Sequence, residues 1–236
     1  VMISKGKSEN LLAGAVIPAA GKGSRFGEKK QFKLLKGVPL LNHVLTPFLQ
    51  SDLIYEIIVV VPEEQVQQIK IQVRSTPKTK NIRVVSGGER RQDSVSNGVK
   101  VLSNQCKLVC IHDVVRPFVT KNMINETIKR CGKYDGAIIA TQAQDTIKRV
   151  ENRRIKETIN RSEIWQAQTP QSFQREKLIE ALESADRDGV TGSDEAFLLE
   201  RIGYYVSVVE GTSANIKITT PEDWFVAEAI WEERYG

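Results

Sequence analysis

The chain has 236 residues, with 34 Lys and Arg, 29 Asp and Glu, and a formal net charge of +5 at pH 7. This length is sufficient for one large domain, so we expect a single domain over 1–236. The basic excess invites a nucleic-acid-binding hypothesis, but acids are interspersed throughout and no dense basic run occurs, which argues against a nucleic-acid partner. The three cysteines lack C-x-x-C spacing, which argues against a zinc site or disulfide framework and favours a reducing compartment.

No targeting or membrane-spanning signal is evident in the sequence. The longest apolar run is too short to cross a bilayer, and residues 1–12 carry no secretory apolar region. We therefore expect a cytoplasmic protein without a membrane partner, and a flexible N-terminal extension over 1–12.

Short apolar runs rich in β-branched residues alternate with helix-like stretches in the first part of the chain. The predicted strands are 15–18, 57–61, 82–85, 108–111 and 137–140, and the predicted helices are 40–49, 63–73, 93–102 and 121–130. This alternation indicates an α/β fold with a doubly wound, mostly parallel sheet. Ligands bind beyond the carboxyl ends of strands in such sheets, so we expect the polar segments 19–30, 86–90 and 112–117 to converge on one crevice.

The pattern changes in residues 142–171, which are rich in Gln, Thr, Lys and Arg and show no long apolar period. They do not look like core, and they fit a charged β-arm that projects from the domain and reaches a second subunit, with a plain surface loop as the alternative. The later predicted elements are helices over 175–185 and 193–201, strand-like runs over 204–209 and 214–218, and a closing helix over 221–234.

The segment from Ala15 to Gly27 reads as a buried strand that runs into a basic glycine loop. Gly21 and Gly23 allow the backbone to approach an anionic ligand closely, and Arg25, Lys29 and Lys30 follow at once, which suits a nucleoside triphosphate. A dinucleotide fingerprint would need glycine at position 26, and no Walker Gly-Lys-Ser/Thr follows. On this segment alone, a tight strand-to-helix turn is the alternative.

Two further motifs follow predicted strands. Gly87 and Gly88 form a turn before a helix start, where backbone amides and the Ser94 hydroxyl could read the edge of a base; alternatively, Asp93 or Ser94 only caps the helix. Asp113 and Arg116 could hold a phosphate-bound Mg²⁺ or a substrate hydroxyl, with a surface ion pair as the alternative.

Lys217 lies between two isoleucines in an expected strand. Its amine could extend harmlessly to solvent, or its apolar neighbours could position it at a phosphate.

Together these segments resemble the 2-C-methyl-D-erythritol 4-phosphate cytidylyltransferases over nearly the whole chain from Gly14 onward. At least six motifs occur in family order, including 158–173, 192–196 and 214–223. The resemblance implies one Rossmann-like nucleotidyltransferase domain that transfers CMP from CTP to the sugar-alcohol phosphate in the non-mevalonate isoprenoid pathway. It also implies release of pyrophosphate, Mg²⁺ as cofactor, and a homodimer with exchanged arms.

The resemblance assigns roles to individual residues. The implied nucleotide-binding residues are Ala19, Ala20, Gly21, Lys22, Gly23, Gly87, Glu89, Ser94, Asp113 and Val114. The implied catalytic residues are Arg25 and Lys30, which stabilise charge at the α-phosphorus, and Arg161 and Lys217, which position the methylerythritol phosphate. The implied substrate-binding residues are Asp113, Arg116, Thr146, Arg161, Ser193 and Lys217. Asp113 is also the candidate metal ligand, the alternative being Mg²⁺ bound by phosphates alone.

This chemistry agrees with the residues themselves, because a phosphate monoester is already a competent nucleophile and needs no histidine base. The chain departs from the family pattern at Lys29, where proline is usual, at Glu89 for Asp, at Val114 for Ala and at Ser193 for Thr. The register against Gln31 and Phe32 favours Lys30 over Lys29 as the working lysine. The nearest rival is ribitol-5-phosphate cytidylyltransferase, which shares the fold and the CTP site, and a basic nucleic-acid-binding module is a third reading.

Overall fold

The computed structural model describes residues 11–21, 33–74 and 80–236. In this part of the chain a seven-stranded sheet has the order β11-β7-β10-β6-β1-β4-β5. Its strands are β1 (Ala13–Pro18), β4 (Ile54–Val61), β5 (Asn81–Ser86), β6 (Leu108–Ile111), β7 (Gly136–Gln142), β10 (Trp165–Gln174) and β11 (Val206–Glu210). All run parallel except β10, which is antiparallel to both β6 and β7. The predicted α/β fold with a mostly parallel sheet is confirmed.

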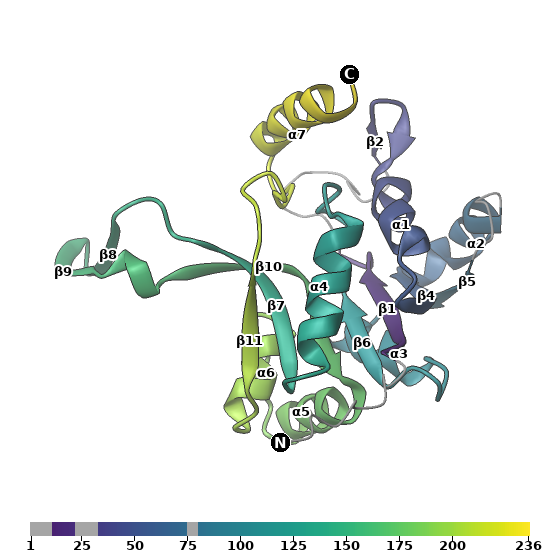
Figure 1. Cartoon of the computed structure of the whole chain (residues 1–236), viewed down its shortest axis with the longest axis horizontal. Coiled ribbons are helices and arrows are strands. Elements are labelled where there is room, and N and C mark those ends of the chain that lie inside the picture. The colour runs from purple at the N-terminus through teal and green to yellow at the C-terminus, as the bar shows by residue number, and fades with distance from the viewer. Residues whose placement is uncertain (1–10, 22–32, 75–79) are drawn as a thin grey trace, which may run out of the picture.

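Helices cover both faces of the sheet (Figure 1). They are α1 (Leu40–Gln50), α2 (Val66–Arg74), α3 (Arg91–Lys100), α4 (Lys121–Cys131), α5 (Arg175–Arg187), α6 (Glu195–Arg201) and α7 (Pro221–Tyr235), with short 3-10 turns η2 (Glu63–Gln65) and η3 (Arg161–Glu163). One face packs against α1, α2 and α4, and the other packs against α3, α5 and α6. The resulting three layers explain why the central strands are apolar on both faces.

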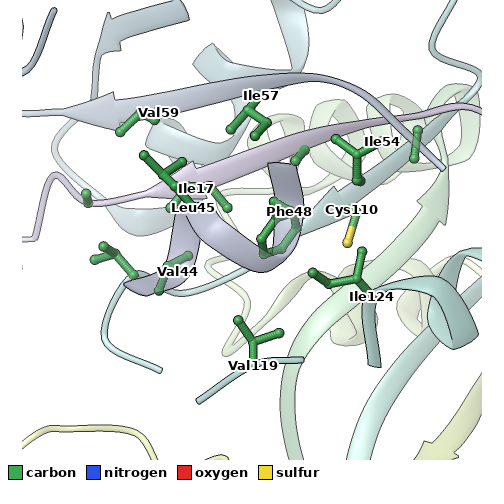
Figure 2. Close-up of a cluster of buried hydrophobic side chains, with 14 of the residues drawn as sticks. Ile17, Val44, Leu45, Phe48, Ile54, Ile57, Val59, Cys110, Val119 and Ile124 are labelled. Carbon is green, nitrogen blue, oxygen red and sulfur yellow. The ribbon is translucent and has the colours of Figure 1, made fainter. Parts of the chain in front are cut away.

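The alternation of side chains along the strands divides the core into two clusters. On β1, Ala15 and Ile17 belong to the α1 side, whereas Val16 belongs to the α3 side. Figure 2 shows the first cluster, where Leu45 and Phe48 of α1 lie against the sheet. These buried side chains make β1 and its neighbours a rigid base for the loops at their carboxyl ends.

Two short strands, β2 (Leu34–Leu35) and β3 (Val38–Pro39), form a hairpin that lies beside α7 in Figure 1. A third apolar cluster joins this hairpin to α7 and to the segment before it; its members are Leu35, Leu40, Phe118, Ile218, Trp224 and Ala227. The third cluster therefore packs the β2–β3 hairpin, which follows the glycine loop in the sequence, against the segment that carries Lys217.

The predicted elements agree with the observed ones apart from the 214–218 run. The sequence pattern predicts a strand here, but the segment forms none. The N–H of Asn215 donates to the carbonyl of Thr212 (3.1 Å) in a local turn, and the N–H of Ile218 donates to the carbonyl of Val115 (2.9 Å). Its apolar alternation arises because Ile218 is buried in the third cluster and not because the segment joins the sheet.

The arm predicted over 142–171 is a projecting hairpin only in part. Strands β8 (Ile147–Glu151) and β9 (Arg154–Ile159) form a two-stranded sheet that extends far from the central sheet (Figure 1). Residues 168–171, however, are buried in β10 within the central sheet. The expectation that the whole segment lies outside the core is wrong there, because hydrogen bonds from the side chains of Gln168, Thr169 and Gln171 offset much of the cost of burying them.

Of the extension expected over 1–12, residues 1–10 lie outside the described part. Leu11 packs against the first core cluster, so a flexible extension is wrong for this residue. Within the described ranges, no helix is both long and apolar enough to cross a membrane.

Candidate functional site

The carboxyl ends of four neighbouring strands, β6, β1, β4 and β5, bring the predicted polar segments together. The N–H of Ala19 donates to the carbonyl of Val60 (2.7 Å), and the N–H of Gly87 donates to that of Val61 (2.8 Å). The N–H of His112 donates to the carbonyl of Val16 (3.0 Å). The predicted convergence is therefore confirmed for the described parts of these segments.

The glycine loop itself is only partly described. Ala19 is buried, Ala20 is half-buried and Gly21 is exposed at the end of β1. The other predicted loop residues, Lys22, Gly23, Arg25, Lys29 and Lys30, lie outside the described residues. Their assignments stay predictions.

Gly87 permits a close contact between the β5 turn and the loop after β1. A Cβ added at Gly87 would lie 2.4 Å from Cβ of Ala20 and 2.7 Å from Oγ of Ser94. Ser94 is buried, and its hydroxyl accepts from the N–H of Gly88 (3.1 Å) and donates to the carbonyl of Arg90 (3.2 Å). Ser94 thus holds the turn against the start of α3.

Helix capping, the alternative interpretation of this motif, is also observed. The carboxylate of Asp93 accepts from the backbone N–H of Arg90 (3.0 Å) at the start of α3. Glu89 and Val114, the other predicted nucleotide-binding residues outside the loop, are exposed and buried respectively.

Asp113 is the electrostatic centre of the site. Its Oδ2 lies 2.7 Å from Nζ of Lys217, and its Oδ1 accepts from the guanidinium of Arg91, whose Nη2 is 2.9 Å away. Burial alone would raise the pKa of Asp113, but the two cations outweigh it and hold this pKa well below its usual range. Asp113 is therefore ionised near neutral pH, although only 7% of it is exposed.

Arg91 also pairs with a second buried acid, Glu195. Nη1 of Arg91 lies 2.7 Å from one oxygen of Glu195 and 2.9 Å from the other. Burial raises the pKa of Glu195, and Arg91 opposes this shift. Burial likewise disfavours the charge on Arg91, but Asp113 and Glu195 raise its pKa above the ordinary value.

Arg91 and Glu195 are site residues that were not predicted from the sequence. The available signal for Glu195 is an acid on the buried face of α6, next to Ala196 and in line with Leu198 and Leu199. For Arg91 there is no comparable signal. Arg90 and Arg91 are consecutive at the start of α3, and the sequence alone does not reveal that Arg91 turns toward Asp113 while Arg90 pairs with Asp93 at the surface.

His112 and Thr169 hold the backbone of Asp113. The hydroxyl of Thr169 accepts from the N–H of Asp113 (3.0 Å) and lies 3.0 Å from Nδ1 of His112. Nε2 of His112 lies 3.0 Å from the carbonyl of Arg116, which can only accept, so Nε2 carries the proton and Nδ1 accepts from Thr169. Burial lowers the pKa of His112 to about 4, which keeps this ring neutral.

Arg116 does not form the surface ion pair with Asp113 that was the alternative. Its Nη1 donates to the carbonyl of Asn215 (2.7 Å) instead. The amide of Asn215 donates to Gln168 and to the carbonyl of Thr169, each at 2.9 Å. These bonds anchor the segment that carries Lys217 to β10, so Lys217 is positioned although it lies in no strand.

The remaining predicted residues lie elsewhere. Ser193 is exposed, two residues before Glu195. Thr146 and Arg161 are exposed at the arm, where Arg161 donates to the carbonyl of Gln144, and the arm extends away from the sheet (Figure 1). The fold therefore brings Asp113, Arg116 and Lys217 together, but it does not bring Thr146 or Arg161 of the same chain to them.

The described residues do not fit a dedicated metal centre. They include no group of three or more His, Cys, Asp or Glu side chains that could hold a metal ion. Asp113 already faces two cations, which oppose the approach of a third. The three cysteines are buried free thiols, and burial raises the pKa of each to about 12.

A mostly parallel α/β sheet with an ordered carboxylate–amine pair at its carboxyl edge is typical of the class of proteins that bind a small molecule at that edge. The family model for 2-C-methyl-D-erythritol 4-phosphate cytidylyltransferase matches residues 13–233. The chain belongs to this family.

Individual relatives agree. The 2-C-methyl-D-erythritol 4-phosphate cytidylyltransferase of Aquifex aeolicus is 46% identical over 216 residues, which cover 92% of this chain and 96% of the relative. That of Halalkalibacterium halodurans is 42% identical over 221 residues, covering 93% and 96%. These matches confirm the resemblance and do not favour the ribitol-5-phosphate enzyme or a nucleic-acid-binding module.

Solved structures share the fold. The 4-diphosphocytidyl-2C-methyl-D-erythritol synthase of Anaerococcus prevotii has a TM-score of 0.85 at 31% identity, covering 95% of this chain and all of that chain. The 2-C-methyl-D-erythritol 4-phosphate cytidylyltransferase of Thermus thermophilus has a TM-score of 0.78 at 31% identity, covering 94% and 99%.

Proposed function

We propose that this chain transfers CMP from CTP to 2-C-methyl-D-erythritol 4-phosphate in the non-mevalonate isoprenoid pathway. An oxygen of the sugar phosphate attacks the α-phosphorus of CTP, and the bond from that phosphorus to the bridging oxygen breaks. The products are 4-diphosphocytidyl-2-C-methyl-D-erythritol and pyrophosphate. The observation that carries this proposal, together with family membership, is the Asp113–Lys217 pair at the sheet edge next to the loop after β1.

The proposed roles follow from charge and position. Lys217 gives one hydrogen bond to Asp113, which leaves two ammonium protons for a phosphate. Arg25 and Lys30 stabilise the charge that develops at the α-phosphorus, and the backbone of the glycine loop binds the triphosphate. No base is needed, which agrees with the neutral, buried state of His112.

Nucleotide recognition is proposed for the turn at Gly87 and for Ser94, Asp113 and Val114. Gly87 and Ser94 stand where a base edge could meet backbone amides, beside Ala20. Ser193 and Arg116 are proposed to assist the sugar phosphate from the loops around Asp113.

Mg²⁺ is proposed as the cofactor, and it would enter with CTP as a complex of the triphosphate oxygens. The ion neutralises phosphate charge when bound. The described residues supply no cage for it, so Asp113 is at most one additional partner.

A homodimer with exchanged arms is also proposed. Support comes from the distance of the arm from its own site (Figure 1) and from the exposed Val150 and Ile155 on the arm, which are 55% and 65% exposed. In a dimer of this kind, Thr146 and Arg161 would serve the site of the other subunit. We further propose a cytoplasmic location, on the ground that the three thiols are free.

The function is tested by measuring pyrophosphate release with CTP and Mg²⁺ and either methylerythritol phosphate or ribitol 5-phosphate. We expect turnover with the former and much slower turnover with the latter, and Lys217→Ala should abolish most of it. Lys107→Ala, which removes an exposed lysine just before β6 and so at the amino end of this strand, is the matched control. Faster turnover of ribitol 5-phosphate would contradict the proposal.

A further inference from the structure

A chain of four alternating charges runs from the interior of the protein to the substrate side of the site. Glu195 binds Arg91, Arg91 binds Asp113, and Asp113 binds Lys217, with closest N–O distances of 2.7, 2.9 and 2.7 Å. The side chain of Glu195 is 1% exposed and that of Lys217 is 39% exposed, and the two side chains between them are 32% (Arg91) and 9% (Asp113) exposed. The inner end is therefore fixed in the core, and the outer end is accessible to a ligand.

Arg91 determines which oxygen of Asp113 faces Lys217. Its Nε and Nη2 both point to Oδ1, at 3.0 and 2.9 Å, so Oδ2 is left for the amine. Arg91 also neutralises part of the negative charge of Asp113. The attraction between Asp113 and Lys217 is weaker as a result, so the amine remains able to bind a phosphate. The guanidinium fork suits this task, because a lysine in its place could not bind two carboxylates in fixed directions.

Glu195 in turn fixes Arg91. Both of its oxygens accept from the same guanidinium nitrogen, and its backbone lies in the first turn of α6, where Asp194 caps the helix by accepting from the N–H of Phe197 (3.0 Å). Among the described contacts of Arg91, those with Glu195 draw its guanidinium away from Asp113. Without Glu195, we expect the guanidinium to move closer to Asp113.

We propose that Arg91 and Glu195 are positioning residues of the active site, which orient Asp113 and through it the amine of Lys217 for the sugar phosphate. This inference rests on the proposed function. The two residues touch neither substrate in this scheme, and their effect reaches the reaction through the carboxylate of Asp113. A disturbance of the pair should therefore affect the sugar phosphate more than CTP, because CTP is proposed to be bound by the glycine loop and by the backbone near Asp113 and Val114, not by the carboxylate of Asp113.

The test compares Glu195→Gln with Asp186→Asn, and Arg91→Lys with Arg90→Lys. The controls carry the corresponding substitutions, carboxylate to amide and arginine to lysine, in an exposed cluster, where Arg90 pairs with Asp93 and Asp186. For the two inner variants we expect kcat/KM for methylerythritol phosphate to fall on the order of tenfold to a hundredfold, with a smaller change in CTP affinity by calorimetry. The controls should keep the values of the unmodified protein.

A second readout does not need turnover. In protein with ¹³C-labelled lysine, the Cε signal of Lys217, assigned with Lys217→Arg, should shift in Glu195→Gln and stay in place in Asp186→Asn. If Glu195→Gln does not fold, the charge-preserving Arg91→Lys provides the same comparison. Folded inner variants with an unmoved signal, or with equal losses for both substrates, would overturn the proposal. Absence of turnover in the unmodified protein would instead contradict the proposed function, and the signal would still test the charge chain.

Discussion

The hydroxyl of Thr169 accepts a hydrogen bond from the backbone N–H of Asp113 at 3.0 Å, and both residues are buried. The contact joins β10 to the loop after β6, so the antiparallel strand directly supports the electrostatic centre of the site. The same hydroxyl donates to Nδ1 of His112, which means that one small side chain uses both its donor and an acceptor.

Replacing Thr169 with valine should therefore weaken both stability and activity. The N–H of Asp113 and Nδ1 of His112 would lose their partner in the interior, at a cost of about 1–3 kcal/mol in the free energy of unfolding. Urea unfolding measures this cost, and Thr169→Ser, which keeps the hydroxyl, is the control. Equal stability of the valine and serine variants would contradict the role of the hydroxyl.

The buried His112 predicts a pH dependence of stability. Burial lowers its pKa from 6.5 to about 4, so between these values the unfolded chain binds a proton that the folded protein does not. This contribution to stability is complete above pH 6.5 and is lost as the pH falls toward 4, by roughly 3 kcal/mol in all.

The measurement is urea unfolding from pH 7.5 to 4.5 for the unmodified protein and for His112→Gln. The difference between the two slopes isolates His112 from the carboxylates that titrate in the same range. An imidazole NMR titration with a midpoint near 6.5 in the folded protein would refute the assignment.

Gly87→Ala should damage the contact between the β5 turn and the loop after β1, because the new Cβ would lie 2.4 Å from Cβ of Ala20. We expect a lower melting temperature and weaker CTP binding. Ala20→Gly removes the atom that the new Cβ meets, so the double variant Ala20→Gly with Gly87→Ala should be more stable than the sum of the single effects. Simple additivity in thermal unfolding would show that the two positions are not in contact.

Lys30→Ala and Arg25→Ala should each lower turnover by on the order of a hundredfold or more, since each removes a preorganised donor to the transition state. Steady-state kinetics measures the effect, and Lys29→Ala distinguishes the two consecutive lysines. A larger loss in Lys29→Ala than in Lys30→Ala would reverse the assignment.

Exchange of arms predicts complementation between inactive subunits. Heterodimers of Lys30→Ala with Arg161→Ala should regain one intact site, because the two residues of a site would come from different chains. Heterodimers of Lys30→Ala with Lys217→Ala are the control, and they should stay inactive since both residues belong to the same chain's half of the site. Activity that does not return in confirmed heterodimers of the first kind would argue for sites within one subunit.

Much of the fold follows from local pattern, as the two-sided apolar runs of β1 and β4 show. The pattern misleads where polar groups are buried or apolar ones leave the sheet. Gln168 and Gln171 look like surface residues, but they are buried and their amide nitrogens donate to the carbonyl of Thr212 and to the carboxylate of Asp194. The Ile-Lys-Ile alternation around Lys217 looks like a strand, although Ile218 packs near α7.

The site residues likewise fall into two groups, those that the local sequence pattern predicts and those that it does not. Asp113 and Lys217 could be predicted because each accompanies a motif with an apolar anchor, and the structure pairs them. Arg91 and Glu195 could not, because the charge of a side chain does not reveal whether a distant residue will neutralise it in the core. For Thr146 and Arg161, the decisive information would lie in a second chain.

The insertion of β10 between β6 and β7 bears on the order in which the protein folds. Strands β1, β4, β5 and β6 can pair once the chain has been made as far as Ile111, but β7 has no neighbouring place on β6 until β10 arrives. Closing the sheet therefore waits for the chain that follows the arm, and this late, non-local step should limit the folding rate. The ribosome would then release Asp113 before the strand that holds its backbone exists, so we expect the active site to be among the last regions to become ordered.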